Sequence, residues 1–211
     1  DRLGVVMVGQ GPDLAPADGL LYALRDVTAT VEREYFIVPS IVSKKVAEGA
    51  AAVAYDVKCG GGAFMKTRED AVRLARRLIA VTRSLGRRAG ARVTDMSQPL
   101  GSAVGNALEV AEAVAVLRGG GPADVRELTL ELSALMLSLS GAATAAEAPA
   151  RARRALESGA AWERFVALVR AQGGDPASVE RPGGLPVAPV VAPVEATPSG
   201  TLEAVYVVAL G

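Results

Sequence analysis

The sequence of 211 residues contains no histidine and only one cysteine. Without histidine, these residues can form no Ser-His-Asp triad, histidine-ligated metal site or imidazole acid–base pair. A single cysteine excludes an internal disulfide framework and a cysteine-rich zinc site. Any proton chemistry therefore uses other groups, or residues outside this sequence.

The formal net charge is zero, because 23 Lys and Arg residues balance 23 Asp and Glu residues. This balance removes the broad electrostatic argument for binding to nucleic acid or to an anionic membrane. The apolar runs are broken by Gly, Pro or charge well short of the roughly 18–20 residues of a membrane-spanning helix. We therefore expect a cytoplasmic protein with no nucleic-acid or membrane partner.

Half of the residues are apolar and 22% are charged, which is typical of a globular chain with one sizeable or two small domains. Short apolar runs predict strands at 3–8, 51–57 and 91–94. Residues 20–24 are expected to form a short helical turn, and the polar and β-branched residues 25–31 a connection. Helical spacing predicts helices at 32–48, 67–85, 102–117, 122–140, 147–156 and 160–171. This alternation predicts an α/β fold, with a mixed, largely parallel sheet flanked by helices.

The domain organisation follows from changes in composition along the chain. We expect a strand and loop of the α/β domain (1–16), a short helical-lobe segment (17–48), the rest of the α/β domain (49–180), a Pro- and Val-rich linker (181–200) and the start of a C-terminal β-rich domain (201–211). Residues 201–210 alternate like a strand, with no second strand after them to pair with. We therefore expect both ends of the chain to be truncated.

Two glycine-rich loops follow predicted strands. The first, Gly9-Gln10-Gly11, has the start of a dinucleotide-binding pattern, but the proline and aspartate residues after it argue against that fold. The second, Gly60-Gly61-Gly62, lacks the Gly-Lys-Ser/Thr of a nucleotide P-loop. It is either a tight strand-to-helix turn or a loop whose backbone approaches a ligand closely.

Ser40 and Lys44 are four residues apart, so a helix places the hydroxyl and the ammonium on one face. With Arg25, just before that helix, they would suit a planar group with carbonyl and N–H edges. Spacing alone favours the simpler interpretation of a solvated polar face. Similarly, Glu112 with the turn at 100–103 would suit a hard cation, although a surface carboxylate is the simpler interpretation.

Several segments, taken in order, carry a resemblance to a known family: RDVTATV at 25–31, SIVSKK at 40–45, DVKCGGGAFMKT at 56–67, TDMSQPLG at 94–101 and AVGNALEV at 103–110. The sequence is similar to the pyrimidine nucleoside phosphorylases and thymidine phosphorylases from about residue 3 to residue 210. The resemblance implies reversible phosphorolysis, in which phosphate attacks the anomeric carbon of a pyrimidine nucleoside and releases the base and a (deoxy)ribose 1-phosphate.

The resemblance also implies roles for particular residues. Arg25, Ser40 and Lys44 match the family's pyrimidine-binding positions, and Ile41 and Phe64 would line the apolar side of the base pocket. Negative charge grows on the base as the glycosidic bond breaks, so two cations and a hydroxyl at its edge would stabilise the transition state more than the substrate.

The family resemblance further implies a potassium ion and no organic cofactor. Leu100, Ala103 and Glu112 match the family's cation ligands, and intact family members are homodimers. The family's phosphate site lies in a segment that precedes the matched part, so we assign no catalytic residue and expect this chain to be inactive alone. The alternative is a non-catalytic pyrimidine-binding or interaction module. The sequence departs from the family pattern at 33–36 and at Pro39, which flank Ser40.

Overall fold

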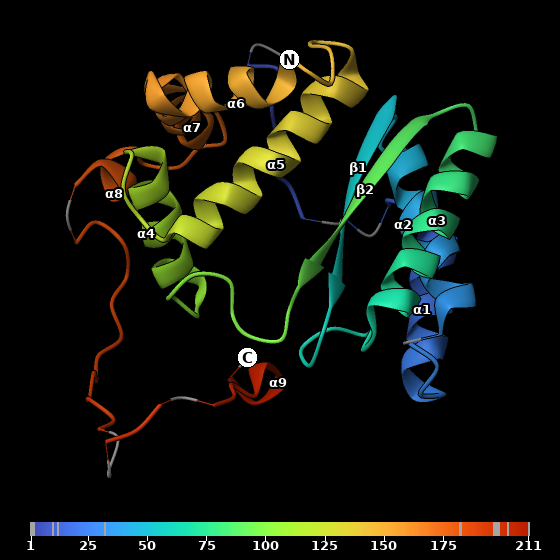
Figure 1. The fold of residues 1–211 in the computed structure, drawn as a ribbon, viewed down its shortest axis with the longest axis horizontal. Helices are drawn as coiled ribbons and strands as arrows, with labels where there is room; N and C mark the ends of the chain where they lie inside the picture. The colour runs from blue at the N-terminus through green and yellow to red at the C-terminus, as the bar shows by residue number, and fades with distance from the viewer. Residues whose placement is uncertain are drawn as a thin grey trace.

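The computed structural model has two parallel strands at its centre, β1 (Ala52–Cys59) and β2 (Arg88–Asp95), which pair in register along their whole length. It describes residues 3–9, 11, 13–31, 33–181, 183–195, 199–201 and 203–210. Helix α3 (Arg68–Ser84) connects the strands and covers one face of the sheet, and α5 (Ala123–Ser140) covers the other (Figure 1). The predicted α/β class is confirmed.

The hydrophobic core lies between the sheet and α3. Alternate residues of β1 are buried on this face: Val53, Tyr55 and Val57. Residues at helical spacing on α3 are buried against them: Ala71, Leu74, Ala75 and Leu78. The Tyr55 and Thr82 hydroxyl oxygens are 2.7 Å apart within this layer, so each of these two buried hydroxyl groups has the other as its hydrogen-bond partner.

Helices α1 (Pro16–Val27) and α2 (Glu34–Ala47) form a hairpin that packs on α3 through α2. Buried residues of α2 join the core, namely Ile37, Val38 and Val42. The Glu34 carboxylate accepts from Arg73 on α3 at 3.2 Å and lies 3.3 Å from the Arg77 guanidinium. These contacts fix the start of α2 against α3.

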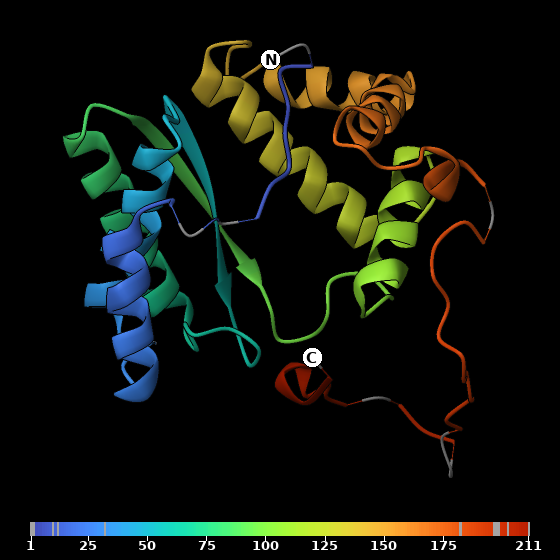
Figure 2. The same ribbon diagram turned by 180° about the vertical axis from the view of Figure 1, so that it is seen from behind.

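The remaining helices lie beyond α5, away from the sheet: α4 (Asn106–Leu117), α6 (Ala148–Glu157), α7 (Ala160–Ala171) and the short α8 (Ala177–Glu180) (Figure 2). The Arg118 guanidinium, just after α4, lies 4.3 Å from the centroid of the Trp162 ring on α7. None of the helices formed by the described residues has both the length and the apolarity needed to cross a membrane.

Residues 183–195 form no helix or strand; they first lie beside α8 and α4 and then extend away from the helices (Figure 1). The short helix α9 (Val207–Leu210) then returns beside the loop that follows β1. A Cβ atom added to Gly62 would lie 2.9 Å from the Val207 side chain, so the two segments are in close contact.

The structure corrects three expectations at the level of single elements. Residues 3–9 form no strand, because the Met7 backbone binds the Gln172 side chain, with a Met7 N to Gln172 Oε1 distance of 3.0 Å. The turn at 20–24 and the connection at 25–31 are largely one helix, α1. The strand expected at 201–210 is wrong for its last four residues, which form α9. The domain boundaries stay predictions.

Candidate functional site

Helix α1 turns an unexpectedly polar face toward α2. Asp18, Tyr22 and Arg25 are spaced i, i+4 and i+7, so they lie on one side of the helix. Asp18 is 9% exposed and Arg25 is 5% exposed, so both charged side chains are buried. Buried charges are stable only when they are paired and hydrogen-bonded, and α2 supplies the partners of Asp18.

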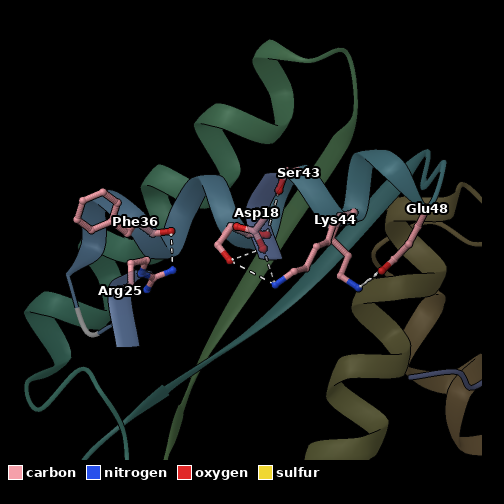
Figure 3. A network of polar contacts seen from close by, with 8 residues as sticks. Asp18, Arg25, Phe36, Ser43, Lys44 and Glu48 are labelled. Carbon is pink, nitrogen blue, oxygen red and sulfur yellow. Dashed lines mark hydrogen bonds and ion pairs between the residues drawn. The ribbon is translucent and has the colours of Figure 1, made fainter. Parts of the chain in front are cut away.

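Asp18 contacts both residues that the helix spacing selected on α2, Ser40 and Lys44, and Figure 3 shows its side chain beside that of Lys44. The Lys44 Nζ atom lies 2.9 Å from Asp18 Oδ2, and the Ser40 hydroxyl donates to the same oxygen at 3.1 Å. Lys44 also donates to the Ser40 Oγ atom at 3.3 Å. Ser40 is 5% exposed and the Lys44 side chain is 21% exposed, so these three residues form a compact, largely buried group instead of the solvated face that spacing alone favours.

Arg25 lies at the other end of the same face and holds the α1–α2 connection together. Its Nη1 donates to the Phe36 carbonyl at 3.2 Å, and its Nη2 donates to the Val31 carbonyl. Its Nε–H is buried and has no hydrogen-bond partner among the described residues. An unpaired buried donor of this kind costs about 1–3 kcal/mol of stability.

The Tyr22 ring lies beside both cations. Its centroid is 5.1 Å from the Arg25 guanidinium carbon and 5.7 Å from Lys44 Nζ, distances typical of cation–π contact. Tyr22 is therefore the side chain that links Arg25 to the Asp18–Ser40–Lys44 group. Asp18 and Tyr22 were not predicted as site residues. Their spacing relative to Arg25 would have found them if 16–27 had been recognised as a helix.

The two apolar residues predicted for the site lie on different elements. Ile41 is half-buried on α2 and packs against the core. Phe64 lies on the loop after β1 and is 53% exposed. Among the described residues, no ring contact joins Phe64 to α1 or α2. The structure therefore gathers Arg25, Ser40 and Lys44 but does not bring Phe64 to them.

The Gly60-Gly61-Gly62 loop is shaped by a neighbouring loop. Gly60 has a φ of +124°, and a Cβ atom there would lie 2.3 Å from the Ser97 hydroxyl oxygen. The Gly62 N–H donates to the Met96 carbonyl at 2.8 Å. Close approach of the chain at 96–97 thus accounts for Gly60 and Gly62, which favours the tight-turn interpretation over the ligand-contacting one.

The candidate cation residues lie at the turn between β2 and α4. Glu112 Oε1 accepts the Ser102 backbone N–H at 2.8 Å, which holds its carboxylate over the turn that includes Leu100 and Ala103. Gly101 has a φ of +73°, and a Cβ atom there would lie 2.1 Å from Glu112 Oε2. The structure therefore brings Glu112 to the 100–103 turn.

A second carboxylate, not predicted, binds the same turn. Asp124 Oδ2 accepts the Gly101 N–H at 2.9 Å, and its Oδ1 accepts the Val125 N–H at 2.9 Å. These backbone donors, the Gly101 N–H foremost, lower the pKa of the Asp124 carboxyl below its usual value of 3.8. Both Glu112 and Asp124 are thus held at this turn by backbone N–H donors.

Comparison with known proteins gives a consistent result. The family model for the glycosyl transferase family, α/β domain, matches residues 1–162. The pyrimidine-nucleoside phosphorylase of Bacillus subtilis (strain 168) is 45% identical over 100% of this chain and 49% of its own length. That of Staphylococcus aureus (strain USA300) is 48% identical over 93% of this chain and 46% of its own length. The chain spans about half the length of these curated relatives, and the resemblance seen in the sequence motifs is confirmed.

Proposed function

The chain belongs to the glycosyl transferase family, α/β domain, and on that premise we propose that it is the base-binding part of a pyrimidine-nucleoside phosphorylase. The observation that carries the proposal is the buried group of Asp18, Ser40 and Lys44, linked to Arg25 through the Tyr22 ring. The relatives are pyrimidine-nucleoside phosphorylases, which indicates the reaction class, and the group supplies donors suited to a polar, uncharged base.

The chemistry asked of these residues is stabilisation of the leaving group. When phosphate attacks the anomeric carbon, the C–N bond breaks and its electron pair moves onto the base, where the carbonyl oxygens share the negative charge. The ammonium of Lys44 and the guanidinium of Arg25 would bind those oxygens more strongly as that charge grows. Loss of one such donor commonly lowers the rate about 10²–10³-fold.

We further propose that the turn at 100–103 binds a potassium ion in the intact enzyme. The Leu100 and Ala103 carbonyls and the Glu112 carboxylate would hold it, and Glu112 Oε2 already faces the space that a Gly101 side chain would fill. A bound monovalent cation would supply positive charge that fixes the turn between β2 and α4. We expect potassium to raise the melting temperature more than sodium does, and the substitution Glu112→Gln to remove the difference.

The phosphate half of the reaction belongs, by the family resemblance, to a segment outside these 211 residues. We therefore expect no phosphorolysis of uridine or thymidine by this chain alone, and activity in the complete polypeptide, which we propose is a homodimer. Release of free base by the 211 residues above the background rate would overturn this expectation.

Calorimetric titration of the chain with uracil and thymine tests the base site directly. We expect Lys44→Ala and Arg25→Ala each to weaken binding at least tenfold, since each removes a charged donor. The matched control is Lys45→Ala, because Lys45 is the neighbouring lysine, is exposed and pairs with Glu48 at 2.9 Å. Equal binding by all three variants and the wild type would refute the assignment. Circular dichroism of Arg25→Ala is needed, since Arg25 also binds the α1–α2 connection.

A further inference from the structure

Resting on the proposed function, we propose that Asp18 is a positioning residue that makes the Ser40 hydroxyl a hydrogen-bond acceptor toward the ligand. In this arrangement the group selects a base edge that offers an N–H beside a carbonyl. It disfavours an edge that offers a bare ring nitrogen beside an amino group. Asp18 thereby sets which pyrimidine the site accepts, without touching the base itself.

The direction of each hydrogen bond follows from the chemistry of the partners. The Asp18 carboxylate, paired with the Lys44 ammonium at 2.9 Å, has no proton to give, so the Ser40 hydroxyl must donate to it. The Lys44 ammonium has no lone pair, so it must donate to Ser40 Oγ. The single hydroxyl proton and one of the two oxygen lone pairs are therefore committed within the group.

The group leaves one hydrogen-bond acceptor and one donor free for a ligand. Ser40 Oγ keeps one lone pair and no proton, so it can only accept from a ligand. Lys44 has used two of its three N–H bonds, so it keeps one donor. An acceptor beside a donor complements an N–H beside a carbonyl, which uracil and thymine present at N3 and its flanking carbonyls. Cytosine has a bare N3 between its C2 carbonyl and its amino group, so the contact of N3 with Ser40 Oγ becomes repulsive, and the contact with Lys44 is kept only on the C2 carbonyl side.

Burial makes this preference strong. Ser40 is 5% exposed and Asp18 is 9% exposed, so water cannot easily replace a lost partner. A buried polar group left unpaired costs about 10- to 100-fold in an equilibrium constant, and this sets the discrimination expected between uracil and cytosine. Because the preference comes from Asp18 through Ser40, it should vanish when the hydroxyl proton is free to turn.

The test is the isosteric substitution Asp18→Asn, measured with uracil and cytosine by calorimetry. An asparagine side chain can donate its own N–H to Ser40 Oγ, which releases the hydroxyl proton toward the ligand. We expect uracil affinity to fall about tenfold and the uracil-to-cytosine ratio to fall by at least as much. Glu48→Gln is the control, because it removes the same charge from an exposed pair with Lys45.

A second measurement needs no ligand. Reductive methylation followed by mass spectrometry reports how readily each lysine reacts. We expect Lys44 to react several-fold faster in Asp18→Asn than in the wild type, and Lys45 to react at the same rate in both. Ser40→Ala, which removes the acceptor but not the carboxylate, should lose base discrimination while Lys44 stays protected.

The outcomes separate the two proposals. If the wild type prefers uracil and Asp18→Asn keeps the same uracil-to-cytosine ratio, the role of Asp18 is overturned and the base site stands. If the wild type binds neither base, the proposed base site is refuted, and the proposed selection between bases is refuted with it, whatever the methylation rate of Lys44. If Lys44 reacts equally in the wild type and Asp18→Asn, Asp18 does not position it, and the inference is again overturned.

Discussion

Gly101 offers a sharp test of the turn that we assign to potassium. Its φ of +73° lies in the left-handed region, where a residue with a side chain costs about 1–2 kcal/mol. In addition, a Cβ atom would lie 2.1 Å from Glu112 Oε2, far inside contact distance. Glu112 would have to move and release the Ser102 N–H, a hydrogen bond to a charged group that contributes about 1–2 kcal/mol at a half-exposed site.

The substitution Gly101→Ala should therefore lower the free energy of unfolding by about 2–4 kcal/mol. For a chain of this size, that corresponds to a fall in melting temperature of roughly 5–15 °C. Urea and thermal unfolding followed by circular dichroism would measure both quantities. The potassium-dependent gain in melting temperature should also disappear, because Glu112 would no longer lie over the turn.

Gly49→Ala is the matched control. Gly49 has nearly the same φ, +77°, but a Cβ atom there meets nothing within 4 Å. Its cost should be the backbone term alone, about 1–2 kcal/mol. If the two variants unfold at the same urea concentration, the contact between Gly101 and Glu112 has no energetic weight, and the reasoning about the turn is refuted.

Two further predictions concern other polar contacts. The substitutions Tyr55→Phe and Thr82→Val should show a coupling energy of about 1 kcal/mol in a double-mutant cycle of urea unfolding, because their buried hydroxyl groups bind each other, and simple additivity would contradict this. Asp124→Asn should lower the melting temperature at pH 7. Since the folded pKa of Asp124 is lowered, its stabilisation is present above its unfolded value near 3.8 and is lost as pH falls through the folded value. The deficit of Asp124→Asn should thus shrink as pH falls below 3.8 and through the lower folded value, and a constant deficit would contradict the assignment.

The elements that carry the core were predictable from the sequence. β1 and α3 follow the periodicities of two and 3.6 residues, and α2 is within two residues of its predicted start and one of its predicted end. The spacing of Ser40 and Lys44 correctly placed them on one helix face. An apolar run for β1 and helical spacing for α2 and α3 sufficed here, because these elements bury an apolar face in the usual way.

Helix α1 was missed because its polarity is inverted. It buries Asp18 and Arg25. The apolar residues on its outer side are exposed, namely Leu20, Leu21, Leu24 and Val27. Its N-terminus also has no side-chain cap. Pattern rules assume that charge faces water, so they could not identify a helix whose charged face binds another helix.

The strand predicted at 3–8 shows a different limit. An apolar run does not say whether a pairing partner is within reach, and here the Met7 backbone finds the Gln172 side chain instead. Asp18 was missed for a similar reason. Its importance comes from Ser40 and Lys44 on the next helix, and that contact exists only in three dimensions.

Pro39 changes which contacts hold the first turn of α2 in place. Proline has no N–H, so the Tyr35 carbonyl one turn earlier receives no helical hydrogen bond from it. The first turn of α2 is instead anchored from outside, by Arg25 on the Phe36 carbonyl and by the Glu34 carboxylate on α3. A ligand that bound the Arg25 guanidinium and moved it would break its hydrogen bond to the Phe36 carbonyl. Base binding and the stability of the first turn of α2 therefore compete for the same side chain.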